Sequence, residues 1–484
     1  MPFRFRGCFA IPRGWSLQHQ FPHSSSIPLN FSSLPHASSS PHSLLLHNFL
    51  PWLENKASST ISSSLSIANS SYGKSLFASK TIQTGDCILQ VPYTVHITAD
   101  NLPPEIRYLI GEDVGNIAKL AIVLLIHKKL GQGSEWYPYI SCLPLQDEMH
   151  NTIFWNESEL EMIRQSSVYQ ETIYQKFQIE KDFLALRPVF ESFCQSLGDF
   201  TCKDFMHACT LVGSRAWGST NGLSLIPFAD FLNHDGISEA IVMSDDDNQC
   251  SEVIADRDYV PGEQVLIRYG KFSNATLMLD FGFTIPYNIY DQVQIQFDIP
   301  KHDPLRDMKL ELLQRYFAPP TKDVKGLKCS VNSFTINSSG KLFDMNWFSI
   351  LFLINIGEVK SARGKGKGVP QSLRALARVL SCTTSQAELY HLVVEAAQTD
   401  GRLARCPLQH TDNEIQAHKM LSSLFIQLIE ERNATIMSLD SCDSSSLYES
   451  LPVRRQMARD LLHGELRILK SASTWLENYC FSLT

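Results

Sequence analysis

The chain has 484 residues, of which 44% are hydrophobic and 19% are charged, and its formal net charge is −8. Such a length predicts two or three domains, and the composition is that of an ordinary folded protein rather than a disordered one. An acidic chain has no excess of Lys and Arg for nucleic-acid phosphates, and the longest apolar run, residues 120–126, is far too short to cross a bilayer. We therefore expect neither a nucleic-acid partner nor a membrane span.

The first 53 residues contain no Asp or Glu, although they carry Arg4, Arg6 and Arg13 and many serines. A leader with arginine and serine but no acid is typical of an organelle transit peptide, and a plain disordered tail is the alternative. We expect residues 1–57 to be a disordered transit peptide. Abundant serine and sparse arginine favour the chloroplast stroma over the mitochondrion.

Short strands broken by turns are predicted from about residue 71 to residue 97. From about residue 101 to residue 212 the apolar spacing becomes helical, as in residues 117–125. Strands resume at Leu223, and the chain beyond about residue 300 is mostly helical. The predicted class is therefore α+β, with one domain over residues 58–290, a helical insertion at 101–212 and a helical domain over 300–484.

Gly73-Lys74-Ser75 resembles the end of a phosphate-binding loop. That motif requires a glycine five residues earlier, where this chain has Ala68, and a helix rather than a strand should follow it. We therefore reject nucleoside triphosphate binding.

No metal site is expected. The acidic turn at residues 244–249 has three adjacent aspartates, but no calcium-ligand spacing follows them, which favours a solvated turn. The twelve cysteines are scattered singly without a Cys-x-x-Cys motif, so neither a zinc site nor a disulfide framework is indicated. Single cysteines of this kind fit a reducing compartment.

The most informative segment is Asn233-His234, which follows a strand-like apolar run at residues 223–226. A turn, a second strand and Tyr269 come some thirty residues later, followed by residues 273–274 and 280–283 (Asp-Phe-Gly-Phe). Buried Asn, His and Tyr side chains at strand ends suit the binding of a polar cofactor, with one phenol facing the reacting centre. An Asn-His pair alone is more often a turn or a core histidine, but this order of motifs is much more specific.

Together with residues 72–78 and 214–217, these motifs resemble the SET-domain protein-lysine methyltransferases. The likeness is greatest to the plant Rubisco large-subunit methyltransferase group, and it covers most of the chain from about residue 70. It implies a SET-domain β-fold with a helical insertion, followed by an all-helical substrate-binding domain. No cysteine clusters flank the motifs, in contrast to histone-directed members with zinc-bound flanks.

The resemblance also implies a role for each matching residue. The cofactor would be S-adenosylmethionine, and the residues implied to bind it are Tyr72, Gly73, Lys74, Asn233, His234 and Tyr269. Tyr269 would be catalytic, beside the sulfonium. The residues implied on the substrate side are Arg215, Asp230 and Phe281. The chain departs from the family pattern at Ser75, where a second glycine is common, and at Phe281, where close relatives often have tyrosine.

Methyl transfer to an amine requires a neutral nucleophile aligned with the methyl group and the sulfur. Deprotonating a free lysine at pH 7 costs about 4–5 kcal/mol, and a dry aromatic channel recovers much of this cost because it disfavours the ammonium. We expect a monomeric S-adenosylmethionine-dependent lysine methyltransferase. Its partner would be a non-histone plastid protein bearing the target lysine, such as the Rubisco large subunit or aldolase. A catalytically silent SET-fold scaffold and a protein-histidine methyltransferase are the alternatives.

Overall fold

The computed structural model describes most of the chain beyond residue 40. The described residues are 41–71, 73–111, 114–219, 222–297, 299, 302–316, 352–357, 368–383, 391, 407–408, 410–441 and 450–484. The chain divides into two units, Met1–Leu44 and Leu45–Thr484, and the architecture below is that of the second. Within the described ranges, no helix combines the length and the apolarity needed to cross a membrane.

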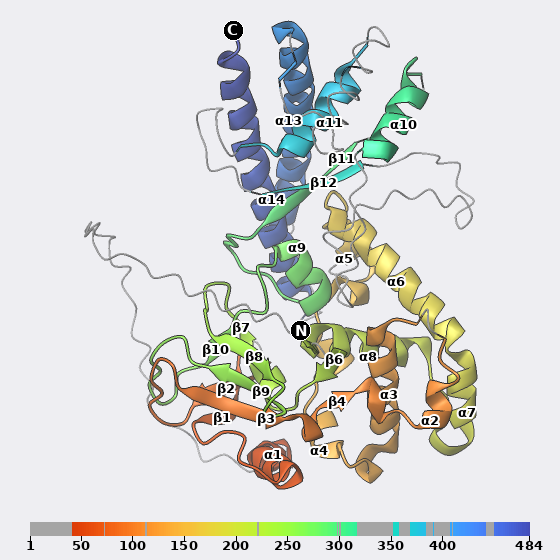
Figure 1. Cartoon of the computed structure of the whole chain (residues 1–484), viewed down its shortest axis with the longest axis vertical. Coiled ribbons are helices and arrows are strands. Elements are labelled where there is room, and N and C mark those ends of the chain that lie inside the picture. Colours follow the sequence, from red (N-terminus) through yellow and green to blue (C-terminus); the bar gives the residue numbers. More distant parts are fainter. Residues whose placement is uncertain are drawn as a thin grey trace, which may run out of the picture. The chain divides into compact units, whose positions relative to one another are not determined.

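In the part of the chain that the structure describes, the strands are short and lie in the first 300 residues, apart from β12 (Figure 1). They are β1 (Leu65–Ser70), β2 (Gly73–Ala78), β3 (Cys87–Pro92), β4 (Ile97–Thr98), β5 (Trp217–Ser219), β6 (Gly222–Leu225), β7 (Asn233–His234), β8 (Ile241–Asp245), β9 (Cys250–Ile254), β10 (Leu266–Ile267), β11 (Gln292–Phe297) and β12 (Phe352–Gly357). They form small sheets of two or three strands. Most pairs are antiparallel, but β7 and β10 are parallel.

Most of the described α-helices lie between β4 and β5 or after β11, and the others lie before β1 and between β10 and β11. They are α1 (Pro41–Ala57), α2 (Pro104–Arg107), α3 (Asn116–Leu130), α4 (Tyr137–Ile140), α5 (Glu157–Glu161), α6 (Ser167–Ala185), α7 (Arg187–Leu197), α8 (Cys202–Arg215), α9 (Asn274–Thr276), α10 (Arg306–Tyr316), α11 (Gln371–Ser381), α13 (Thr411–Ser441) and α14 (Ser450–Phe481). A π-helix, Leu277–Phe281, follows α9 directly. The expected α+β class, with helices inserted between strands and a mainly helical C-terminal region, is confirmed. That region is not all-helical as expected, because β12 lies in it and pairs with β11.

Helix α8 packs on the buried helix α3 and brings Arg215 to the strands. It begins with a capping box, in which Thr201 Oγ1 accepts the Asp204 N–H at 3.0 Å and the Asp204 carboxylate accepts the Thr201 N–H at 3.3 Å. It ends at Arg215, where a cation is favoured by the carbonyl end of the helix dipole. The local sequence thus fixes both ends of the helix that carries this arginine.

The two longest helices, α13 and α14, lie side by side in the C-terminal region (Figure 1). With α11 they enclose a second hydrophobic core, which includes Phe425 and Trp475. Arg378 is fully buried there and binds Glu414 with two hydrogen bonds, of 2.8 and 2.7 Å. Burial raises the pKa of this carboxyl, but the Arg378 guanidinium and the Leu408 N–H together outweigh burial and hold the pKa at about 2.

Helix α14 also contacts the strand-rich part of the chain through polar side chains. Arg454 binds Glu159 of α5 at 2.7 Å, and Ser166 donates a hydrogen bond to Glu465 at 2.5 Å. A Cβ atom at Gly464 would lie 2.2 Å from the carboxylate of Asp291, so glycine permits this close approach. Asp291 in turn accepts the backbone N–H of the first residue of α9 at 2.8 Å.

The expectation that residues 1–57 are disordered is wrong for residues 48–57. They belong to α1, where Phe49 and Leu53 are fully buried in the first hydrophobic core. The Phe49 ring lies 5.5 Å from the ring of Phe231 between centroids, and Glu54 accepts the Ile61 N–H at 2.9 Å. The acid-free, serine-rich composition of the first 53 residues hides this helix, although Phe49, Leu50, Trp52 and Leu53 form an apolar run. The order of residues 1–40 lies outside the described residues.

Candidate active site

Parallel pairing of β7 with β10 brings the Asn-His pair beside Tyr269. Asn233 is paired with Leu266 and His234 with Ile267, so Tyr269 follows just beyond the end of β10. The Tyr269 N–H donates to His234 Nδ1 at 3.0 Å, and the two rings lie 5.1 Å apart between centroids. Two segments about thirty residues apart in sequence therefore form one site.

The Tyr269 hydroxyl has a fixed direction. It donates to the backbone carbonyl of Leu232 at 2.7 Å. Burial raises the pKa of this phenol well above its usual value, while the charge of Arg215 lowers it and that of Asp230 raises it. The hydroxyl therefore stays protonated at neutral pH, and its oxygen lone pairs face away from Leu232 and are available to accept hydrogen bonds.

The imidazole of His234 is neutral. Burial lowers its pKa, an effect that the charge of Asp235 opposes. Because Nδ1 accepts the Tyr269 N–H, the ring proton lies on Nε2. The site therefore places no positive histidine beside Tyr269.

Phenylalanine rings form an apolar wall next to Tyr269. The Phe281 ring lies 5.2 Å from the Tyr269 ring, 5.6 Å from Phe272 and 6.4 Å from Phe283, between centroids. Phe281 is the last residue of the π-helix, and single π turns are frequent at functional sites. The helix ends at Gly282, whose φ of +78° suits glycine and where a Cβ atom would lie 2.7 Å from Asn151 Oδ1.

Arg215 and Asp230 meet at one side of this site. Arg215 Nη1 donates to the Asp230 backbone carbonyl at 3.0 Å and lies 3.4 Å from its Oδ2. The Tyr139 hydroxyl donates to the same Oδ2 at 2.8 Å. Burial raises the pKa of Asp230, whereas Arg215 and the Tyr139 hydroxyl stabilise its anion. Among the described residues, none donates to the buried Oδ1.

The first loop reaches the site through β2. Asn233 Nδ2 donates to Ser75 Oγ at 2.6 Å, which joins β2 to β7. Gly73 has a φ of +89°, which favours glycine, and pairs with Ser70 at the turn between β1 and β2. Lys74 is partly buried, and its charge lowers the pKa of the Cys142 thiol, which burial raises. Tyr72 lies outside the described residues.

Two contacts of this site have no signal in the sequence. Tyr139 belongs to an aromatic run that indicates core packing, and it is indeed fully buried, but its hydroxyl binds Asp230, 91 residues away. Ser75 likewise makes a hydrogen bond that the sequence does not indicate, since its partner Asn233 is 158 residues away. Only the folded chain brings either pair together.

The Asp280 carboxyl has a raised pKa, which makes the stability of the chain depend on pH. Burial raises the pKa of its carboxyl to about 7, and its charge is among the effects that raise the pKa of the largely buried Glu171, also to about 7. In an unfolded chain an aspartate titrates near pH 4. The stability contributed by the neutral acid is therefore complete below pH 4 and is lost as the pH rises through 7.

We expect Asp280→Asn to stabilise the chain at pH 8 by about 1–2 kcal/mol and to change its stability little at pH 4, because the amide stays neutral at both pH values. Urea unfolding at several pH values measures this difference. An unfolding free energy that depends on pH as steeply in the variant as in the wild type would contradict the assignment.

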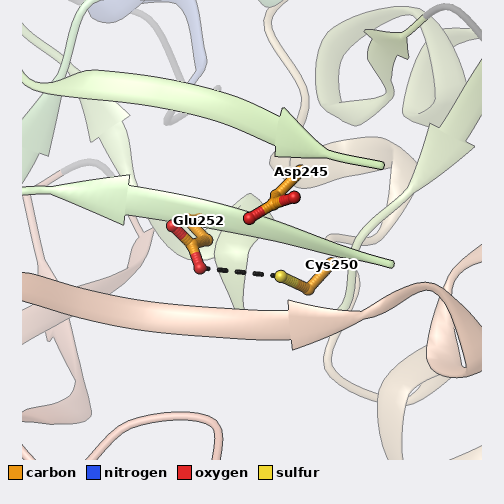
Figure 2. A group of neighbouring side chains, drawn as sticks. All are labelled: Asp245, Cys250 and Glu252. Carbon is orange, nitrogen blue, oxygen red and sulfur yellow. Dashed lines mark hydrogen bonds between the residues drawn. The ribbon is translucent and has the colours of Figure 1, made fainter. Parts of the chain in front are cut away.

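Outside this site, Asp245, Cys250 and Glu252 gather on the β8–β9 hairpin (Figure 2). Their potential ligand atoms lie within 4.8 Å of one another. The Gln90 amide donates to Glu252 at 2.7 Å and to Cys250 at 3.2 Å, and burial raises the pKa of the Cys250 thiol. Because the Gln90 amide already binds both Cys250 and Glu252, we assign no ion to this group.

Comparison with known proteins agrees with this geometry. The family model of the SET domain matches residues 73–270, and the model described as Rubisco LSMT substrate-binding matches residues 300–469. The solved structure described as Rubisco LSMT bound to AdoMet superimposes with a TM-score of 0.66 at 21% identity, covering 92% of this chain and 93% of that one. Fold and site thus define a SET-domain protein. With matches to both models, the chain is similar to the Rubisco large-subunit methyltransferase group.

Curated relatives match only part of the chain. An actin-histidine N-methyltransferase of Danio rerio is 29% identical over 280 residues, which are 54% of this chain and 46% of that protein. The chloroplastic Rubisco large-subunit N-methyltransferase of Pisum sativum is 27% identical over 292 residues, which are 56% of this chain and 57% of that protein. The chain spans about half the length of the curated relatives it matches.

Proposed function

We propose that this chain is a protein-lysine N-methyltransferase that uses S-adenosylmethionine. The observation that carries the proposal is the Tyr269 hydroxyl, which is held by Leu232 beside the Asn-His pair and against the Phe281 ring. A protonated phenol with free lone pairs next to an apolar wall suits the alignment of a neutral amine. In the proposed roles, Tyr269 is the catalytic residue and Phe281 lines the target pocket.

The residues of the site fit the cofactor. A bound S-adenosylmethionine supplies a methyl group on a positively charged sulfur. The neutral His234 puts no like charge beside it. In the proposed arrangement Asn233 and His234 hold the cofactor. Tyr72, Gly73 and Lys74 lie along it, and the Lys74 ammonium suits its carboxylate.

The amine must lose its proton before transfer. An apolar surrounding lowers the pKa of a lysine, because it disfavours the ammonium, and the wall of Phe272, Phe281 and Phe283 provides such a surrounding. The Tyr269 oxygen then accepts an N–H of the neutral amine, which directs the nitrogen lone pair along the line of transfer. Arg215 and Asp230 form a nearly neutral pair on the substrate side and add little net charge to the pocket.

The proposed substrate is a non-histone plastid protein, such as the Rubisco large subunit or aldolase. The match of residues 300–469 to a substrate-binding model supports docking on the helical C-terminal region, and the Pisum sativum relative is chloroplastic. We propose the chloroplast stroma as the location, with a cleavable leader that ends before the buried part of α1. The enzyme would act as a monomer.

A second candidate is methylation of histidine, which is favoured by the actin-histidine N-methyltransferases among the relatives. The test incubates the full chain with a stromal extract and S-adenosylmethionine labelled in its methyl group, and maps the label by mass spectrometry. Label on lysine is expected. Label on histidine would establish the second candidate, and no label together with no cofactor binding by calorimetry would leave only a silent scaffold.

A further inference from the structure

Ser75 makes a buried hydrogen-bonded link between the first loop and the Asn-His pair. Its side chain lies in β2 and is fully buried. Its Oγ accepts the Asn233 amide at 2.6 Å and donates to Ser70 Oγ at 2.7 Å, with the Gly73 carbonyl 3.3 Å away as a second acceptor. A glycine at position 75, as is common in the family, would lack every one of these bonds.

The link fixes which way the Asn233 amide faces. A hydroxyl has a single proton, and that of Ser75 is directed to Ser70 or to Gly73. Toward Asn233 the hydroxyl therefore acts only as an acceptor, and Asn233 must present its NH₂ group to it. Asn233 Oδ1 then faces away from Ser75, and among the described residues it receives no hydrogen bond.

An amide fixed in this way is selective for a donor. An oxygen that only accepts hydrogen bonds suits an ammonium group and disfavours a carboxylate. Without Ser75, the Asn233 amide would be free to turn over and present its NH₂ group on the ligand side. Part of the free energy of cofactor binding would then be needed to select one amide orientation.

We propose that Ser75 is a positioning residue that orients Asn233 so that Oδ1 accepts the α-ammonium of S-adenosylmethionine. This inference rests on the proposed function and deepens it. Ser75 thus contributes to cofactor binding by orienting Asn233. A glycine at this position contributes by letting the backbone approach the cofactor closely.

The test compares two ligands by calorimetry on the full chain: S-adenosylhomocysteine, which carries the α-ammonium, and 5′-methylthioadenosine, which lacks the whole amino-acid portion. Ser75→Ala is expected to weaken the first about fivefold to tenfold, the range for one lost hydrogen bond, and to leave the second unchanged. In transfer assays, KM for S-adenosylmethionine should rise by the same factor with kcat nearly constant. Equal weakening of both ligands would overturn the proposal, since it would indicate damage to the site as a whole.

Two further variants make the test specific. Ser64→Ala is the matched control, because Ser64 is also buried and its hydroxyl donates to a backbone carbonyl, that of Ile88, at 3.4 Å. It should change neither affinity. In an Asn233→Ala background, Ser75→Ala should have no further effect on S-adenosylhomocysteine, and additive losses would overturn the coupling. A wild-type chain that binds neither nucleoside would overturn the proposed function itself, whereas unchanged affinity in Ser75→Ala would overturn only the role of Ser75.

Discussion

Tyr269→Phe is expected to lower kcat about 100-fold or more, because the amine loses the oxygen that directs its lone pair. The ring remains, so its contacts with His234 and Phe281 are kept and the affinity for the cofactor should change little. The Leu232 carbonyl loses its hydrogen bond, which costs about 1 kcal/mol of stability. Single-turnover methyl transfer measures the rate, and urea unfolding measures the stability.

Tyr259→Phe is the matched control for this change. Tyr259 is also buried and also loses one hydroxyl hydrogen bond, the one donated to Asp256 at 2.9 Å, but it lies outside the site. Its variant should retain wild-type kcat. If Tyr269→Phe transferred methyl groups as fast as the control variant, the catalytic role of the phenol would be refuted.

Removal of residues 1–57 is expected to destabilise the chain by several kcal/mol, because it deletes Phe49 and Leu53 from the first core. Truncating a buried Phe or Leu to Ala costs about 2–5 kcal/mol each, and a typical domain has only about 5–15 kcal/mol in total. The urea midpoint of a chain beginning at residue 58 should therefore lie far below that of the full chain, or the shorter chain should fail to fold.

A chain beginning at residue 45 is the control for this truncation. It keeps Phe49, Leu53 and the hydrogen bond from Ile61 to Glu54, so its midpoint should match that of the full chain. Equal midpoints for the two truncated chains would contradict the buried role of α1. A mature protein cut at residue 57 would also be inconsistent with this helix, since the cut would remove it.

Much of the fold could be predicted from local patterns. The change from strand-like to helical spacing near residue 101, and back near Leu223, corresponds to helices α2 to α8 between β4 and β5. The spacing of apolar residues and the positions of turn residues are local properties of the sequence, so they can be recognised without the tertiary structure. The α1 helix was missed because composition over fifty residues outweighed two buried side chains one turn apart.

The candidate site was predicted in part. The order of Asn233, His234 and Tyr269 indicated a single site, and parallel pairing of β7 with β10 brings them together. Their hydrogen-bond partners could not be predicted. The Leu232 carbonyl that receives the Tyr269 hydroxyl and the Ser75 hydroxyl that receives Asn233 depend on how distant strands register against each other.

By itself, the sequence determined the class of fold, the order of the motifs and the chemical groups available for the proposed methyl transfer, because each depends on residue types at short spacing. The tertiary structure alone decided which atoms face one another. It set the tautomer of His234, the direction of the Tyr269 hydroxyl and the bond from Asn233 to Ser75. Hydrogen bonds are directional and act within about 3 Å, so they are fixed only when the whole chain has packed.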